Sequence, residues 1–342
     1  MEYNRVNTPS ISIIIPIFNA EKYLPECIAS VRACPDMTME CILINDGSTD
    51  SSRVICESVV DEDKRFKLIN KDNSGVSNSR NIGIKTARGK YIFFLDADDY
   101  IDVSHWNTIL THAHDDEADF IAFGYYSLFS DGHRKEELFA IKNELSNDIS
   151  DTLFALIASP MLNTCWAKLL RRSVIDELDL RFDSSLVTCE DAVFIIDFIE
   201  SAHTFLLCNH SVLYYRIHDS SAMHKRPLEL RIEDFSLLFK RRKEFLDICS
   251  NTELYNFMLR QSFSVLTNMI LEFASRHSIN ELKDACKTIN IHPVGREILN
   301  YLNPISISPF YKKLEYIWMK RMSNRILSYY MKLKSYFIRS FR

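Results

Sequence analysis

The sequence predicts an α/β protein with a mostly parallel central sheet, helices on both faces of the sheet, and a helical C-terminal region. Short apolar runs alternate with helix-periodic segments through the first hundred residues, which is typical of a doubly wound sheet. Each apolar run ends on polar residues, so one edge of the sheet gathers polar side chains. From Leu228 to about Leu302 the pattern is helical.

The individual elements follow from hydrophobic periodicity. Buried strands are predicted over residues 11–15, 40–44, 66–69 and 91–95. Amphipathic helices are predicted over residues 20–31, 51–60 and 76–87. The polar residues 130–150 predict a loop or weak hairpin, and short strands are expected at Trp166–Leu170 and Leu213–Arg216. We therefore expect three regions, which cover residues 1–220, 221–308 and 309–342.

The composition favours a cytoplasmic protein. The chain has 342 residues, of which 46% are apolar, and no run approaches the roughly 20 apolar residues that span a bilayer. The N-terminal stretch MEYNRVNTPS contains no apolar signal region. The nine cysteines form no CxxC pair, which favours free thiols in a reducing compartment. Only seven glycines are present, too few for a glycine-rich phosphate loop.

Three carboxylates follow the strand predicted over residues 91–95, namely Asp96, Asp98 and Asp99. In an open α/β sheet the ligand crevice lies outside the carboxyl ends of the strands. Clustered carboxylates favour a divalent cation, and their hard oxygens suit Mn²⁺ or Mg²⁺. The alternative is a solvated acidic turn.

Two other strand ends carry polar motifs. The segment Asn45–Asp50 is either a tight turn with a helix cap, or it positions Asp46 to accept a hydrogen bond from a nucleobase imide. Arg80 lies in the turn and helix Asn73–Gly83. It is either a solvated helix residue or a group that reaches the edge of the sheet to orient an acid or a base.

The stretches SIIIPIFNAEKYL, INDGSTDSS and NSGVSNSRNIGIKTARGKYIFFLDADDYI together resemble the inverting glycosyltransferase family 2, of the bacterial polysaccharide type, which has a GT-A fold. The resemblance covers about residues 10–220 and implies a nucleotide-sugar donor, expected to be a UDP-sugar. It implies a nucleotide pocket lined by Pro16, Phe18, Asn19, Asp46, Asn73, Arg80 and Asp96. It also implies a metal on the donor diphosphate, held chiefly by Asp98, together with Asp96. His218 is a candidate third ligand or a structural histidine.

The downstream motifs suggest the rest of the site. The resemblance implies that Asp191 is the general base and that Glu190 contacts the acceptor; the alternative is two acids favoured by a helix N-terminus. Trp166 and Lys168 resemble a Trp-x-Lys-Leu segment of bacterial members and would meet a sugar face and a phosphate or carboxylate. The alternative there is a core tryptophan and a surface lysine. Arg216 is a candidate diphosphate contact.

The C-terminal residues 309–342 are strongly basic. They hold nine of the 41 basic residues and one of the 46 acids, which leaves 32 basic and 45 acidic residues, a net charge of −13, on residues 1–308. Apolar and aromatic side chains recur there at roughly helical spacing: Phe310, Leu314, Ile317, Trp318, Ile326, Tyr329, Tyr330, Leu333 and Phe337. A basic amphipathic helix predicts attachment to an anionic membrane surface. The alternative is a helix packed on the body or in a dimer.

We therefore expect an inverting, metal-dependent glycosyltransferase that moves a sugar from a nucleotide sugar to a hydroxyl of a glycan. A lipid-linked acceptor at the inner face of the cell membrane is expected, as in capsule or O-antigen assembly, and a homo-oligomer stays open. A metal-dependent nucleotidyltransferase is the rival enzyme, and a catalytically silent scaffold of the same fold is the other alternative. The acidic body argues against nucleic-acid binding.

Overall fold

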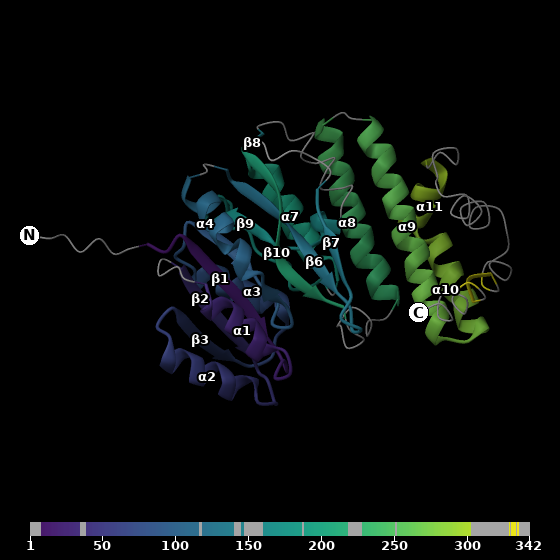
Figure 1. Ribbon diagram of the computed structural model, residues 1–342. Helices are drawn as coiled ribbons and strands as arrows, with labels where there is room; N and C mark the ends of the chain where they lie inside the picture. The colour runs from purple at the N-terminus through teal and green to yellow at the C-terminus, as the bar shows by residue number, and fades with distance from the viewer. Residues whose placement is uncertain are drawn as a thin grey trace, which may run out of the picture. The chain divides into compact units, whose positions relative to one another are not determined.

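The computed structural model describes residues 8–34, 39–115, 118–139, 145–146, 160–186, 188–217, 228–249, 252–301, 328, 330–332 and 334 (Figure 1). The chain divides into two compact units. The sheet unit comprises Met1–Leu186 and Glu190–His224. The helical unit comprises Val187–Cys189 and Lys225–Arg342.

One mixed sheet forms the centre of the sheet unit. Among the described residues its strand order is β3-β2-β1-β4-β9-β6-β10-β5, with β7 paired to β6 and β8 to β10. The strands are β1 (Ile11–Ile17), β2 (Met39–Asp46), β3 (Phe66–Lys71), β4 (Tyr91–Phe94), β5 (Tyr100–Ile101), β6 (Phe120–Leu128), β7 (Arg134–Glu137), β8 (Leu145–Ser146), β9 (Lys168–Arg171) and β10 (Phe205–Arg216). Strands β1 to β4 pair in parallel, as do β6 and β10, whereas β9 runs antiparallel to both β4 and β6.

Helices flank both faces of this sheet (Figure 1). They are α1 (Leu24–Arg32), α2 (Ser52–Glu62), α3 (Val76–Thr86), α4 (Trp106–Asp115), α6 (Arg172–Glu177) and α7 (Glu190–Ser201). Right-handed crossovers put α1 and α2 on one face and α3 on the other, because the chain reverses its direction along the sheet after β3. Helix α3 packs closely on β1, where a Cβ at Gly83 would lie 2.3 Å from Ile14 Cγ2.

The reversal of strand order places a topological switch point at β1 and β4. The chain passes from β1 outward to β2 and β3 and then returns to place β4 on the other side of β1. Ligands bind at such a switch point, outside the carboxyl ends of the strands. Asn19 follows β1 and Asp96 follows β4 at this point.

The predicted α/β class and the first four strands and three helices are confirmed, with ends that shift by a few residues. Strand β1 continues through Pro16 to Ile17 instead of ending at the proline. The strand predicted at Trp166–Leu170 begins only at Lys168. The reason is that Ala167 adopts a left-handed conformation, with φ of 53°, which interrupts the extended backbone.

The helical unit contains four long helices within residues 228–301. They are α8 (Leu228–Cys249), α9 (Thr252–Arg276), α10 (Ile279–Ile291) and α11 (Pro293–Tyr301), in agreement with the predicted helical pattern. Ser278 begins α10 with a capping box, in which its hydroxyl accepts from the Glu281 N–H and the Glu281 side chain returns to Ser278. In the described part of the chain, no helix is both long enough and apolar enough to cross a bilayer.

Most of the predicted basic tail lies outside the described residues, but a few of its side chains pack within the helical unit. Ser328 and Met331 are buried. The Lys332 ammonium donates to the Ala274 carbonyl at 2.7 Å and to the His277 carbonyl at 2.5 Å. A cation at these carbonyls complements the C-terminal end of α9. This contact is what the packed-helix alternative predicts for that stretch.

Candidate functional site

The turns that follow β1 and β2 are bound together at the edge of the sheet. Asn19, with φ of 48°, accepts a 2.8 Å hydrogen bond from the Thr49 N–H through its side-chain oxygen. Its own N–H donates to Ser48 Oγ at 3.1 Å. Phe18 beside it is 52% exposed, so an apolar ring faces solvent next to the switch point. These contacts fix the expected nucleotide-binding turns against one another.

Asp46 ends β2 and is buried, with both carboxylate oxygens engaged. Its Oδ1 accepts from the Lys71 ammonium and from the Ser74 N–H at 2.8 Å, and its Oδ2 accepts from the Gly75 N–H at 2.9 Å. The carboxylate therefore holds the turn at Asn73, itself exposed, that leads into α3. A base contact by Asp46, as the sequence predicts, must use the remaining lone pairs of these oxygens.

The acidic turn after β4 is clamped by Arg216 from β10. The Arg216 N–H donates to Asp99 Oδ1 at 2.8 Å, and its guanidinium donates to the Asp98 carbonyl at 2.9 Å and pairs with Glu26. The guanidinium also lies between the rings of Tyr23 and Tyr100, about 5 Å from each centroid. Arg216, predicted as a diphosphate contact, thus shapes the turn that carries the predicted metal ligands.

The turn presents carboxylates of two kinds. Asp96 and Asp98 are partly exposed, whereas Asp99 is 1% exposed. Burial, together with the nearby charges of Asp98 and Asp96, raises the pKa of Asp99 well above its ordinary value. Asp99 Oδ2 has no hydrogen-bond partner among the described residues. A buried carboxylate oxygen without a partner, next to two further acids, is energetically unfavourable unless a proton or a cation neutralises the charge.

The carboxylates of this turn fit a divalent cation that is coordinated partly by the protein and partly by the oxygens of a diphosphate. No group of three or more ligating side chains is arranged as a complete metal site among the described residues. Mn²⁺ and Mg²⁺ at phosphate sites are usually held by one or two carboxylates plus phosphate oxygens and water, so a complete protein cage is not required. Asp98 and Asp96 supply such carboxylates, and His218 lies outside the described residues.

A single buried arginine joins this turn to the start of α7. Arg80 in α3 is 3% exposed. Its guanidinium donates to Asp191 Oδ1 at 2.6 Å, to Asp96 Oδ1 at 2.9 Å and, at 3.4 Å, to Glu190 Oε1. The ring of Phe182 lies 5.3 Å from the guanidinium carbon. Arg80 is therefore not a solvated helix residue; its guanidinium orients acidic groups, which is what the other alternative predicts.

The surroundings of Glu190 and Asp191 raise the pKa of both carboxyl groups, which makes each a better proton acceptor. Burial raises the pKa of Asp191, and the Arg80 charge opposes that rise. Asp191 Oδ2 accepts from the Cys165 N–H at 3.3 Å. Burial and the neighbouring Asp191 charge raise the pKa of Glu190 to about 7, again against the effect of Arg80. Perturbed carboxylates in a crevice are candidates for acid–base chemistry.

Trp166 and Lys168 lie inside the sheet unit. Trp166 is 4% exposed, stacks on Tyr215 with centroids 5.1 Å apart, and meets Tyr125 edge-on. Lys168 is 1% exposed, so the surface lysine of the alternative prediction is wrong. Both side chains are buried, and the expected sugar and phosphate contacts stay predictions.

Sequence reasoning missed three groups of the site. Lys71 neutralises Asp46, and Tyr23 and Tyr100 sandwich Arg216. The Cys165 N–H holds Asp191. Lys71 meets Asp46 because it ends the neighbouring strand in register with it, and this pairing could not be predicted from the local sequence.

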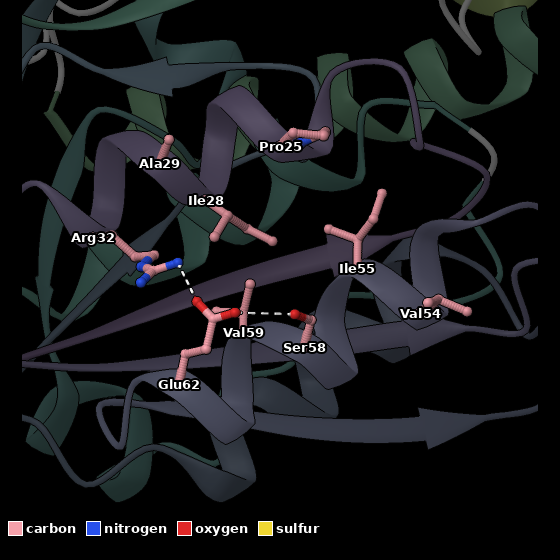
Figure 2. Close-up of a pocket in the computed structure, with 9 residues that line it drawn as sticks. All are labelled: Pro25, Ile28, Ala29, Arg32, Val54, Ile55, Ser58, Val59 and Glu62. Atoms are coloured by element: carbon pink, nitrogen blue, oxygen red, sulfur yellow. Dashed lines mark hydrogen bonds and ion pairs between the residues drawn. The ribbon is translucent and has the colours of Figure 1, made fainter.

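An apolar groove lies elsewhere, between α1 and α2 (Figure 2). Its volume is about 580 Å³. Ile28 and Ala29 line it from α1, and Ile55 and Val59 from α2, while an Arg32–Glu62 ion pair of 2.9 Å crosses one end. None of the residues predicted to bind donor, metal or acceptor lines this groove.

Comparison with known proteins agrees with this geometry. The model of glycosyl transferase family 2 matches residues 12–179, the part of the chain that supplies the switch point and the acidic turn. The uncharacterized glycosyltransferase EpsJ of Bacillus subtilis is 30% identical over 215 residues, 62% of each chain. The match therefore spans about three fifths of EpsJ. The putative glycosyltransferase EpsH of the same organism is 29% identical over 302 residues, 86% of this chain and 87% of EpsH.

A solved structure shares the fold. S. aureus TarS 1–349, in complex with UDP-GlcNAc, superposes with a TM-score of 0.70 at 17% identity, over 95% of this chain and 91% of that chain. At this identity the likeness shows the fold alone, a mixed sheet with surrounding helices and a helical C-terminal region. Together with the match over residues 12–179 and the ordered motifs of the first hundred residues, these likenesses establish that the chain belongs to glycosyltransferase family 2, with a GT-A fold.

Proposed function

We propose that the protein is an inverting, metal-dependent glycosyltransferase that moves a sugar from a nucleotide sugar, with UDP as the nucleotide, to a hydroxyl of a glycan. The observation that carries this proposal is the Arg80 network. One guanidinium holds Asp96, in the turn of the predicted donor site, and Asp191, the predicted base, within 2.9 Å of its nitrogens. The proposed donor site and the proposed base therefore lie on either side of the Arg80 guanidinium.

Asp191 is the proposed general base. Its Oδ1 is held by the charged Arg80, whereas its Oδ2 accepts a longer bond from the Cys165 N–H and keeps a lone pair for a proton. The acceptor oxygen attacks the anomeric carbon as the bond to the diphosphate breaks, and its proton passes to Asp191 Oδ2. Attack opposite to the leaving group inverts the anomeric configuration. Glu190 lies beside the base as the proposed acceptor contact.

The proposed donor site lies at the switch point. Asn19 and Phe18 follow β1, Asp46 and Asn73 border the neighbouring turn, and Pro16 sits within the last residues of β1. Asp98, assisted by Asp96, is proposed to hold Mn²⁺ or Mg²⁺. When bound, that ion offsets the negative charge that develops on the departing diphosphate. Arg216 keeps the turn in place, and we propose that its guanidinium also contacts the diphosphate.

The acceptor and location are proposed from the sequence resemblance. Members of the bacterial polysaccharide type build surface glycans, so a lipid-linked acceptor at the inner membrane face fits, with residues 309–342 as the basic contact to the membrane. The nucleotidyltransferase alternative is weaker because the chain has no glycine-rich phosphate loop. The silent-scaffold alternative is weaker because Asp96, Asp98 and Asp191, the acids that the proposed chemistry needs, are all present.

A donor screen tests the proposal. Purified protein, Mn²⁺ and a panel of nucleotide sugars are incubated with and without a glycan acceptor, and the released nucleoside diphosphate is measured. We expect one UDP-sugar to be turned over, and Asp191→Asn to keep donor affinity while losing transfer by a factor of about 10²–10⁴. A wild-type enzyme that turns over no nucleotide sugar would refute the function. An Asp191→Asn enzyme with the wild-type rate would refute only the base.

A further inference from the structure

Lys168 is a buried cation that the proposed mechanism does not use. It begins β9 and is 1% exposed, deep in the sheet unit. Burial lowers the pKa of its ammonium to about 7. Lysine is almost never fully buried unless its head group is paired, so its partners indicate why it is retained there.

Both hydrogen-bond partners of Lys168 lie on the turn that precedes it. Its Nζ donates to Thr164 Oγ1 at 3.1 Å and to the Trp166 carbonyl at 3.1 Å. Cys165 lies between these two anchoring points. The ammonium therefore pins the turn on either side of one residue.

The turn is held in a conformation that needs such support. Ala167 has φ of 53°, which an alanine adopts at a steric cost. Its carbonyl accepts from the Phe123 N–H at 3.0 Å. Strained residues persist where the surrounding contacts over-determine them, and the two Lys168 bonds supply such contacts.

The pinned residue is the one that holds the proposed base. The Cys165 N–H donates to Asp191 Oδ2 at 3.3 Å. Asp191 Oδ2 is the oxygen that receives the proton in the proposed mechanism. Lys168 is thus connected to Asp191 Oδ2 through the turn Thr164–Trp166, whose middle residue donates to that oxygen.

We propose that Lys168 is a positioning residue for Asp191, which it orients through the Thr164–Trp166 turn without touching substrate. This inference rests on the proposed function, because it takes Asp191 as the base. Misplacing a reacting group by about 1 Å can cost 10²-fold in rate. A loosened turn therefore lowers the rate of the chemical step and leaves donor binding intact.

Lys168→Met removes the ammonium and keeps the length of the side chain. We expect kcat to fall by a factor of about 10–100 while KM for the donor changes less than about twofold, because the donor site lies on other segments. Thr164→Val removes one anchoring oxygen and is expected to lower kcat in the same direction. Thr164→Ser keeps that oxygen and is expected to lose less than Thr164→Val, which gives a test even if Lys168→Met folds poorly.

A matched control separates positioning from lost stability. Ser12 is buried near the start of β1, away from the switch point, and its hydroxyl donates to Glu40 Oε1 at 2.7 Å. Ser12→Ala is expected to lower the urea midpoint of unfolding but to leave kcat unchanged. If Ser12→Ala and Lys168→Met lower kcat alike at equal loss of stability, the positioning role is refuted.

A double-mutant cycle decides whether Lys168 acts through the base. If it does, Lys168→Met lowers kcat in the wild-type background but not in Asp191→Asn, because the misplaced oxygen no longer serves as the base. Equal losses in both backgrounds would overturn the inference, as would wild-type kcat in both Lys168→Met and Thr164→Val. An Asp191→Asn enzyme without any loss is a different result, which refutes the proposed base.

Discussion

Replacing Arg80 by methionine should destabilise the sheet unit strongly, and more at high pH than at low pH. The guanidinium is the only positive group bonded to Asp96, Glu190 and Asp191 in the described residues. Their side chains are 26%, 17% and 15% exposed, so water screens the stranded acids only in part. Breaking a buried ion pair by removing one partner costs about 3–5 kcal/mol, and we expect a loss of unfolding free energy in this range at pH 8.

The pH dependence has a definite sign. Without Arg80, the charges of the three acids repel one another and the pKa values of Glu190 and Asp191 rise further, so the folded variant binds more protons than the folded wild type. Stability then falls more steeply with rising pH in the variant. Each extra proton is worth about 1.4 kcal/mol per pH unit, so the difference between the proteins should shrink by about 1–3 kcal/mol from pH 8 to pH 6.

Urea unfolding at pH 6 and pH 8 measures this directly. Arg65→Met is the matched control, because the acid that Arg65 pairs with among the described residues is Asp63, whose pKa it holds below the ordinary value. That acid stays ionised from pH 6 to pH 8, so the loss in Arg65→Met should not vary with pH. A loss under about 1 kcal/mol in Arg80→Met, or one equal at both pH values, would refute the account of Arg80.

Three further results are expected. Because burial raises the pKa of Asp191, kcat should decline with falling pH at a midpoint above the ordinary aspartate range, and a profile that stays flat down to pH 5 contradicts this. Asp98→Ala should abolish the gain in UDP affinity that Mn²⁺ provides, as measured by calorimetry; an undiminished gain removes Asp98 from the metal site. Reversing the charge of Lys312 and Lys313 leaves the Lys332 contacts untouched and should weaken flotation with anionic vesicles at low salt. Equal flotation of the reversed and native chains would favour the packed tail.

Hydrophobic patterning was sufficient for the first four strands because β1, β2 and β4 each contain a continuous apolar run, and the shorter β3 keeps three apolar residues among polar ones. Every residue of β2 is buried, which is the pattern of a parallel strand covered on both faces. The same signal was present in β6, Phe120–Leu128, but the sequence analysis assigned no strand there. Its order in the sheet follows from long-range pairing with β9 and β10, which sequence periodicity does not encode.

Side-chain roles were harder to predict than elements, because they depend on distant partners. Arg80 and Asp191 are 111 positions apart, and the solvated and buried alternatives for Arg80 have the same local sequence. Lys168 follows two buried residues and precedes two more, yet only tertiary packing decides that its ammonium turns inward. Trp166 is a core residue, as one of the two alternatives predicted, because it packs against Tyr125 and Tyr215 from other strands.

The Arg80 network also explains why a buried arginine suits the proposed site, in which two carboxylates with different roles must lie at a fixed distance. In the proposed mechanism, the departing diphosphate needs a cation and the hydroxyl that loses its proton needs a carboxylate. Arg80 fixes the distance between Asp96 and Asp191 because both accept from one planar group, on separate nitrogens. Lysine has no such rigid fork, so Arg80→Lys would keep the charge and lose the spacing. The carboxylates are therefore placed by geometry as well as by charge.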